Sequence, residues 1–392
     1  MVQAALAFND LPLPPIALAG RRRALPPLQT EAQEARFSAE QVDPGFQLGW
    51  DYAHHGLVPP AEHLLPGHPL RQGWEAGRVT FGRRTLKASR HVQQWLQLRL
   101  AAWQGGQAFE GVQVTPNFLA QIDSPRCPVT RSEFADGAEA AIERLNHRAG
   151  YAAGNLVCLS TRAQQAKGGR RWDEARLMAV LAESRQGDAH GGVAEGLCSA
   201  EWARLATLQS FVTPLPHEIA SALPLRVLPP NRLRLVNPIQ GLQALITLQL
   251  THHGFAVRIA QLTGLLPGAA LRRDFHLFFH TLLPRAGQGG RPSSAPKAAS
   301  GARPPEGAKE LGSGPSLLGL QALRERLEDA WADPVVLRRW QRFAGQLNAE
   351  QADQLLRKLV SKGLAAGMGR RAEWHPAART TEGWALESAG AA

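Results

Sequence analysis

Apolar residues recur at intervals of three or four positions along most of the chain, which is the spacing of one face of an α-helix. In the first half this pattern is clearest over residues 89–104, where Ser89 can cap the first turn and Gly105 can end the last. A second helix is predicted over 172–184, and the segment 199–284 has a mostly helical pattern that prolines interrupt. The chain is therefore predicted to be predominantly α-helical.

The predicted helix at 89–104 has an aromatic stripe. Its apolar positions are Val92, Trp95, Leu96, Leu100 and Trp103. Such a stripe is typical of a helix that packs into a core, and we interpret it in this way. The alternative is a surface on which nucleic-acid bases stack, which requires exposed tryptophan rings.

Three more helices are predicted near the C-terminus. Apolar residues at helical spacing mark the first two, namely Leu317, Leu320, Leu323, Leu327 and Trp331, then Val336, Trp340, Phe343 and Leu347. Asn348 and Gln351 form a near-capping box at the start of the third. These helices predict a separate C-terminal helical module.

A different pattern occurs near residue 150. Residues 155–159 have the composition of a short buried strand, and a second strand is predicted at about 140–145. Turn-forming residues lie between the two strands, and Ser160 or Thr161 can cap a helix that follows. Together these elements predict a strand–loop–strand–helix unit. The predicted fold class is therefore α+β, with this small unit embedded in a predominantly helical protein.

Shifts in composition divide the chain into seven parts. They are a Pro-rich N-terminal arm (1–45), an N-terminal domain (46–186) that contains the hairpin–helix unit (127–168), a Gly-rich link (187–198), a helical domain (199–284), a disordered linker (285–315), the C-terminal helical module (316–370) and a tail (371–392).

Charge and composition narrow the function classes. The 392 residues include 44 Lys and Arg against 33 Asp and Glu, a net charge of +11 that favours polyanionic partners. A hydrophobic content of 44% excludes wholesale disorder, and no apolar run is long enough to cross a membrane. Three cysteines without a CxxC pair and an N-terminus without a signal-peptide pattern lead us to expect a cytoplasmic protein.

Four histidines lie close together in the sequence, at His54, His55, His63 and His68. Imidazoles can bind a metal, but these spacings match no usual ligand pattern. We interpret this segment as a surface loop.

The strand–loop–strand–helix unit contains I-E-R-L-N (142–146), G-Y-A-A-G-N-L (150–156) and S-T-R-A-Q-Q-A-K (160–167), after C-P-V-T (127–130). These strings resemble the HNH endonuclease superfamily. More narrowly, they are similar to a variant in phage and bacterial proteins that has D-R-[IV]-[DN], G-Y-x-x-G-N-[VL] and N-x-x-K. The resemblance is limited to residues 127–168.

The resemblance implies phosphodiester hydrolysis, which requires a metal to neutralise phosphate charge and a base to activate water. By position, Glu143 and Gln164 match ligands of a divalent metal such as Mg, Mn or Ni, and Arg144 stands where the base is expected. Asn155 and Gly154 match the residues that hold the hairpin, and Lys167 matches the terminal lysine of the pattern.

The sequence departs from the family pattern at the expected metal ligands. Glu143 replaces the usual Asp and Gln164 replaces Asn, so each side chain is one methylene longer. Arg144 stays protonated and is a poor base, whereas His147 lies close enough in sequence to act across the turn. The alternative for His147 is an ordinary surface histidine.

A basic cluster follows the second predicted strand, with Arg162, Lys167, Arg170 and Arg171 and no acid between positions 162 and 171. It can bind phosphates, or its cations can simply favour a helix C-terminus. The CxxC pairs that hold structural zinc are absent, so zinc is not expected, and Cys127 and Cys158 are interpreted as buried thiols.

Three functions remain as hypotheses. The first is a metal-dependent HNH-like endonuclease that acts on DNA. The second is a catalytically inactive protein on the same scaffold that binds nucleic acid or a protein partner. The third is a helical interaction protein in which segments 199–284 and 317–365 do the binding. None of them involves a membrane.

Overall fold

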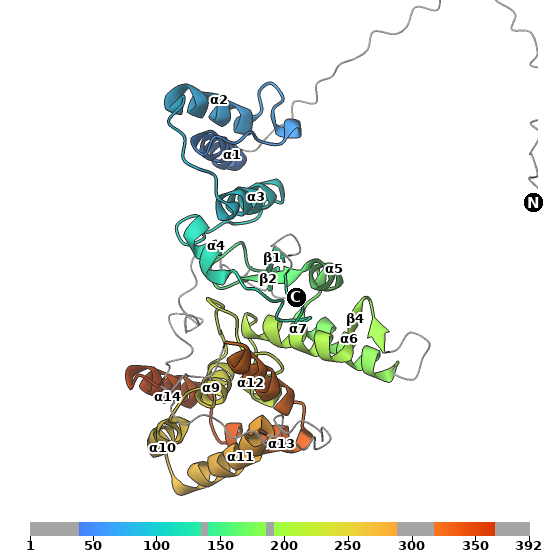
Figure 1. The fold of residues 1–392 in the computed structure, drawn as a ribbon, viewed down its shortest axis with the longest axis vertical. Coiled ribbons are helices and arrows are strands. Elements are labelled where there is room, and N and C mark those ends of the chain that lie inside the picture. Colours follow the sequence, from blue (N-terminus) through green and yellow to red (C-terminus); the bar gives the residue numbers. More distant parts are fainter. Residues whose placement is uncertain (1–38, 135–139, 186–191, 288–316, 365–392) are drawn as a thin grey trace, which may run out of the picture.

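The computed structural model describes residues 39–134, 140–185, 192–287 and 317–364 (Figure 1). These residues are mostly helical, with two small antiparallel sheets. Figure 1 shows α1–α3 at one end, the β1–β2 hairpin in the middle and the last helices at the other end. The helices of the first end are α1 (Ala39–His54), α2 (Pro69–Phe81) and α3 (Arg90–Gln104), with a short 3₁₀ turn at Ala61–His63.

Helices α1 and α2 cross with their backbones in close contact at glycines. A Cβ atom added to Gly73 would lie 1.9 Å from the Phe46 carbonyl oxygen, and one added to Gly49 would lie 1.9 Å from that of Leu70. Helix α3 packs beneath this pair through its buried leucines, and Trp95 and Trp103 lie partly buried against the same small core. The aromatic stripe therefore packs against a core.

The middle of the molecule holds α4 (Pro116–Ile122), β1 (Ala140–Arg144), β2 (Leu156–Ser160) and α5 (Thr161–Lys167). The two strands pair antiparallel, and Ser160 caps α5 by accepting a hydrogen bond from the Ala163 N–H at 3.3 Å. The predicted order of strand, loop, strand and helix is confirmed, as is the predominantly helical character of the chain.

The predicted Gly-rich link contains a second hairpin. After α6 (Trp172–Ser184), the strands β3 (Val193–Ala194) and β4 (Leu197–Cys198) pair and lead into α7 (Ser199–Phe211). Glu195 and Gly196 both have positive φ, 44° and 85°, which is the conformation of a tight two-residue hairpin turn. Residues 193–198 of the predicted link thus form a hairpin because their turn chemistry allows strand pairing.

The remaining helices form one core with the hairpin region. They are α8 (His217–Ala222), α9 (Pro238–Gln249), α10 (Phe255–Leu265), α11 (Ala269–Gly287), α12 (Leu317–Ala330), α13 (Pro334–Ala344) and α14 (Ala349–Ser361). Trp331 and Trp340 lie fully buried with ring centroids 5.3 and 5.4 Å from that of Phe278. The prediction of a separate C-terminal module is wrong, because its apolar faces complete a core shared with α9 and α11.

Several predicted segments lie wholly or mostly outside the described residues. They are residues 1–38 of the N-terminal arm, residues 288–315 of the linker and the tail at 371–392. Helix α1 begins at Ala39, inside the range predicted for the arm.

We expect Gly73→Ala to lower the free energy of unfolding by about 2 kcal/mol or more, because the added methyl overlaps backbone atoms that cannot move aside. The matched control is Gly264→Ala, an exposed helical glycine with no atom within 4 Å of an added Cβ, which should raise stability by roughly 0.5–1 kcal/mol. Urea unfolding measures both. Equal effects of the two substitutions would contradict the close crossing of α1 and α2.

Candidate functional site

The hairpin places neighbouring residues of β1 on opposite faces of the small sheet. Glu143 pairs with Val157, and its side chain lies on the face covered by α5. Arg144 pairs with Leu156 on the opposite face, because side chains alternate along a strand. The two residues predicted as carboxylate ligand and base are therefore not brought together.

Glu143 lies at the centre of a small polar cluster. Its Oε2 accepts a hydrogen bond from Gln164 Nε2 at 3.0 Å, and its Oε1 accepts one from Lys167 Nζ at 3.1 Å. His147, in the loop after β1, brings Nε2 to 3.8 Å from the same Oε1. Four of the predicted residues thus converge, and they come from β1, the following loop and α5.

The Lys167 side chain supplies a buried cation to this cluster. It is 0% exposed, whereas the Glu143 side chain keeps 17% exposure and that of His147 keeps 33%. Burial lowers the pKa of Lys167, and the Glu143 carboxylate opposes this shift by stabilising the ammonium. The carboxylate and the imidazole are consequently arranged around a positive charge that belongs to the chain itself.

The Nε2 atom of His147 faces both a donor and an acceptor. Lys167 Nζ lies 2.5 Å away and the Gly168 carbonyl oxygen lies 2.8 Å away. A nitrogen that accepts from the ammonium carries no proton for the carbonyl, so the two contacts belong to different protonation states. Burial and then the Lys167 charge lower the pKa of His147, which favours the neutral, proton-accepting imidazole near neutral pH.

Asn155 fixes the loop that carries His147. Its side chain is fully buried, and Oδ1 accepts a hydrogen bond from the Asn146 N–H at 2.9 Å. Its Nδ2 donates to the carbonyl oxygens of Asn146 at 2.9 Å and Gly150 at 3.0 Å. These three bonds close the loop between β1 and β2, which is the position that the family pattern predicts for a structural asparagine.

Gly154 and Arg144 support the hairpin outside the polar cluster. Gly154 has a φ of 89°, and an added Cβ would lie 2.6 Å from that of Arg234, so both conformation and space require glycine. The Arg144 guanidinium lies 4.5 Å from the ring centroid of Tyr151 and donates to Gln107 Oε1 at 2.8 Å. Arg144 thus has a cation–π contact and a hydrogen bond on the face away from Glu143.

All four basic residues predicted to contact nucleic acid have acidic partners. The pairs are Arg162–Glu201, Lys167–Glu143, Arg170–Glu195 and Arg171–Asp173. Two of these acids come from the β3–β4 turn and from α7, which follow the cluster in sequence. The absence of acids between positions 162 and 171 therefore does not produce an unpaired cationic surface.

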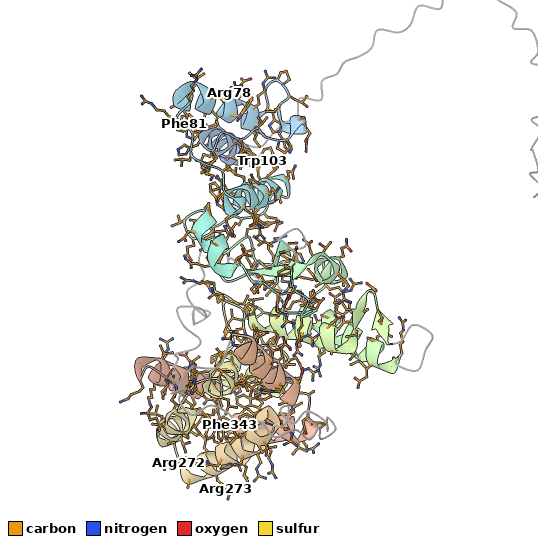
Figure 2. The ribbon with its side chains drawn as sticks, viewed as in Figure 1. Arg78, Phe81, Trp103, Arg272, Arg273 and Phe343 are labelled. Atoms are coloured by element: carbon orange, nitrogen blue, oxygen red, sulfur yellow. The ribbon has the colours of Figure 1, made fainter. Side chains whose placement is uncertain are left out.

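An unpaired basic surface lies instead between α2 and α3. Arg83, Arg84 and Lys87 are exposed and have no ion pair within the part of the chain that the structure describes. Figure 2 shows the nearby Arg78 and Phe81 at the end of the molecule distant from the hairpin. The sequence signal that could have identified this surface is a stretch from 76 to 109 without a single Asp or Glu.

The two cysteines of the hairpin region are buried and chemically different. Cys127 Sγ accepts hydrogen bonds from the N–H groups of Ser160 at 3.3 Å and Thr130 at 3.5 Å, and these bonds outweigh burial and lower its pKa. Burial raises the pKa of the Cys158 thiol to about 12. Both are free cysteines, and Cys127 joins its turn to the start of α5.

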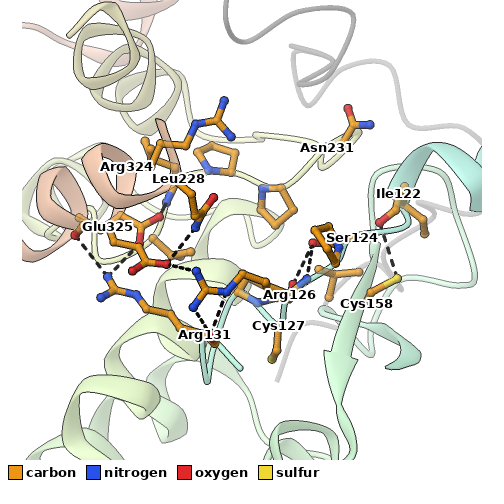
Figure 3. Close-up of a pocket in the computed structure, with 18 of the residues that line it drawn as sticks. Ile122, Ser124, Arg126, Cys127, Arg131, Cys158, Leu228, Asn231, Arg324 and Glu325 are labelled. Carbon is orange, nitrogen blue, oxygen red and sulfur yellow. Dashed lines mark hydrogen bonds and ion pairs between the residues drawn. The ribbon is translucent and has the colours of Figure 1, made fainter. Parts of the chain in front are cut away.

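The turn that contains Cys127 also contacts the C-terminal helices (Figure 3). Arg126 pairs with Glu325 at 2.7 Å, and Arg131 pairs with the buried Glu328 at 2.9 Å. Glu328 also accepts a hydrogen bond from the Leu228 N–H at 2.8 Å. These pairs border a cavity of about 380 Å³ at the seam between the hairpin region and α12. The charged groups named here are paired with each other, so they hold the two regions together.

The four N-terminal histidines do not share one site. His54 stacks on Phe81 with centroids 4.3 Å apart, whereas His63 Nδ1 lies 3.3 Å from His68 Nε2 and His63 Nε2 lies 2.8 Å from the Gln104 amide. Burial lowers the pKa of both His63 and His68. Within the described ranges, no three His, Cys, Asp or Glu residues form a group that could hold a metal ion.

Comparisons of the chain with models of protein families, with curated proteins and with solved structures find no match. No helix in the described ranges combines the length and the apolar content that crossing a bilayer requires. The geometry of the polar cluster is therefore the basis for a functional proposal.

His147 should titrate below the ordinary histidine value of about 6.5, because burial and the Lys167 charge disfavour its protonated form. In Lys167→Met the pKa of His147 should rise, and in the control Lys87→Met it should not change. Since the folded state binds this proton more weakly than the unfolded chain, His147 costs stability as the pH falls below about 6.5. NMR titration of the imidazole measures the effect, and a His147 pKa at or above the ordinary value contradicts the proximity of the ammonium.

Proposed function

We propose that this chain is an HNH-like endonuclease that hydrolyses phosphodiester bonds with the help of a divalent metal. The main observation behind the proposal is that Gln164, His147 and the buried Lys167 ammonium all converge on the Glu143 carboxylate. Carboxylate and amide oxygens are ligands that suit Mg²⁺ and Mn²⁺. The motif resemblance at residues 127–168 supports the same conclusion.

The Glu143 carboxylate fits a metal because it already binds a positive charge. The Lys167 ammonium stands in for that charge, 3.1 Å from Glu143 Oε1 and in contact with His147. A dication and an ammonium would repel each other at such distances, so Lys167 would have to lose its charge where Glu143 held a metal. The lowered pKa of Lys167 favours this exchange, because an amine that loses its proton no longer opposes the metal.

The chain's own residues then have separate roles. Glu143 and Gln164 would hold the metal, which would neutralise charge on the scissile phosphate and the leaving oxygen. His147 in its neutral form would accept a proton from water at Nε2, and the Gly168 carbonyl, 2.8 Å away, would stabilise the resulting imidazolium. Asn155 keeps His147 at this position through its three hydrogen bonds to the loop backbone.

A second candidate function is a catalytically inactive protein on the same scaffold, which binds nucleic acid or a partner. The observation that favours it is that Lys167 already neutralises Glu143, so the cluster is stable without a metal. The unpaired Arg83, Arg84 and Lys87 provide phosphate contacts in either case.

Plasmid nicking separates the two candidates. We expect the wild type to convert supercoiled DNA to the nicked form with at least one of Mg²⁺, Mn²⁺ and Ni²⁺. Glu143→Gln should reduce cleavage to background, and His147→Ala should reduce its rate by about 100-fold or more. Glu218→Gln, an exposed carboxylate on α8, is the matched control and should cleave like the wild type. Thermal unfolding verifies that each variant is folded.

Absence of cleavage with all three metals would remove the nuclease proposal. If DNA binding then remains and weakens with salt and with combined Arg83→Ser and Arg84→Ser substitutions, the second candidate holds. Cleavage that survives Glu143→Gln places the activity outside this cluster and also contradicts the proposal.

A further inference from the structure

Helix α6 has an apolar stripe on the side that faces away from the core. Leu177 is 68% exposed, Val180 is 60% exposed and Leu181 is 39% exposed. The opposite side of the helix is buried against α7 through its alanines, Ala175, Ala179 and Ala182. A helix that needs only one buried face thus carries a second apolar face.

Four charged residues border this outer stripe in a symmetric order. At 100° per residue, Arg176 and Glu183 lie on one edge of the stripe, and Glu174 and Arg185 lie on the other. All four side chains are exposed. Within the described residues, no ion pair is formed by Arg176, Glu183 or Arg185. Other arginines of this chain, such as Arg170 and Arg171, do pair with acidic side chains.

This order of charges is self-complementary for one arrangement only. When two copies of a helix pack antiparallel about a two-fold axis, each edge meets the same edge of the other copy. With the axis beside Val180, Arg176 faces Glu183 of the second copy. On the other edge, Glu174 faces Arg185. Val180 then meets its own symmetry mate. A parallel pair would bring unlike edges together and lose this match.

We propose that the outer face of α6 is a self-association surface that pairs antiparallel with α6 of a second copy of this chain. Three exposed apolar side chains form a small interface, so the dimer is weak and depends on the four charge pairs for its register. The proposal is independent of the nuclease function, because it uses no residue of the Glu143 cluster.

A pair of charge-reversal variants tests the proposal by sedimentation equilibrium of the full chain. Wild type should show a mass that rises from monomer to dimer with concentration. Arg176→Glu alone and Glu183→Arg alone should each weaken the association constant by about tenfold or more, because each creates two like-charge contacts. An equimolar mixture of the two variants should restore a 1:1 dimer, since every reversed charge then meets its opposite. Arg338→Glu, an exposed arginine on α13, is the matched control and should associate like wild type.

Three results would overturn the proposal. The first is a wild type that stays monomeric at every concentration. The second is a mixture of the two variants that associates no better than either variant alone, because an antiparallel pair requires rescue. The third is a melting temperature of monomeric Val180→Asp that lies below that of the monomeric wild type. That result would mean that another segment of the same chain covers the apolar stripe.

Discussion

The buried ammonium of Lys167 determines how the centre of this molecule is arranged. A fully buried cation is costly unless anionic and polar groups surround it, and Glu143, the Gly168 carbonyl and the His147 ring are those groups. Removing the Glu143 carboxylate would leave the charge uncompensated, and removing the lysine would leave the carboxylate with Gln164 and the more distant His147 ring. The same arrangement is the basis of our proposal that a metal cation binds at this position.

The scaffold holds this arrangement from several sides. Asn155 closes the β1–β2 loop, Ser160 caps α5, and Cys127 joins its turn to the same helix start. Arg126 and Arg131 then connect that turn to α12 through Glu325 and Glu328. The polar cluster is therefore connected to helices about 200 residues later in the chain, and one hydrophobic core extends from the hairpin to the C-terminal helices.

The parts of the structure that depend on neighbours in sequence could be predicted. The two strands, the capped helix and the position of Asn155 follow from turn residues and a short apolar run, and the structure has them where the pattern indicates. The parts that depend on distant segments could not. Glu201 pairs with Arg162 only because β4, which leads into α7, lies beside α5. Trp331 and Trp340 enter a core whose other half ends before residue 288. The side of β1 to which Arg144 points follows from strand alternation, but its partner Tyr151 depends on the path of the loop.

Our central proposal is that a divalent metal takes the place of the Lys167 charge. Calorimetric measurement of Mn²⁺ binding as a function of pH tests this proposal most directly. Metal binding that expels a proton should tighten with pH, by at most about tenfold per pH unit for each proton released. Lys167→Met should bind Mn²⁺ more tightly than wild type and with a weaker dependence on pH, whereas Lys87→Met should match wild type. Equal affinity of Lys167→Met and wild type, or no binding by either at any pH, would contradict the account.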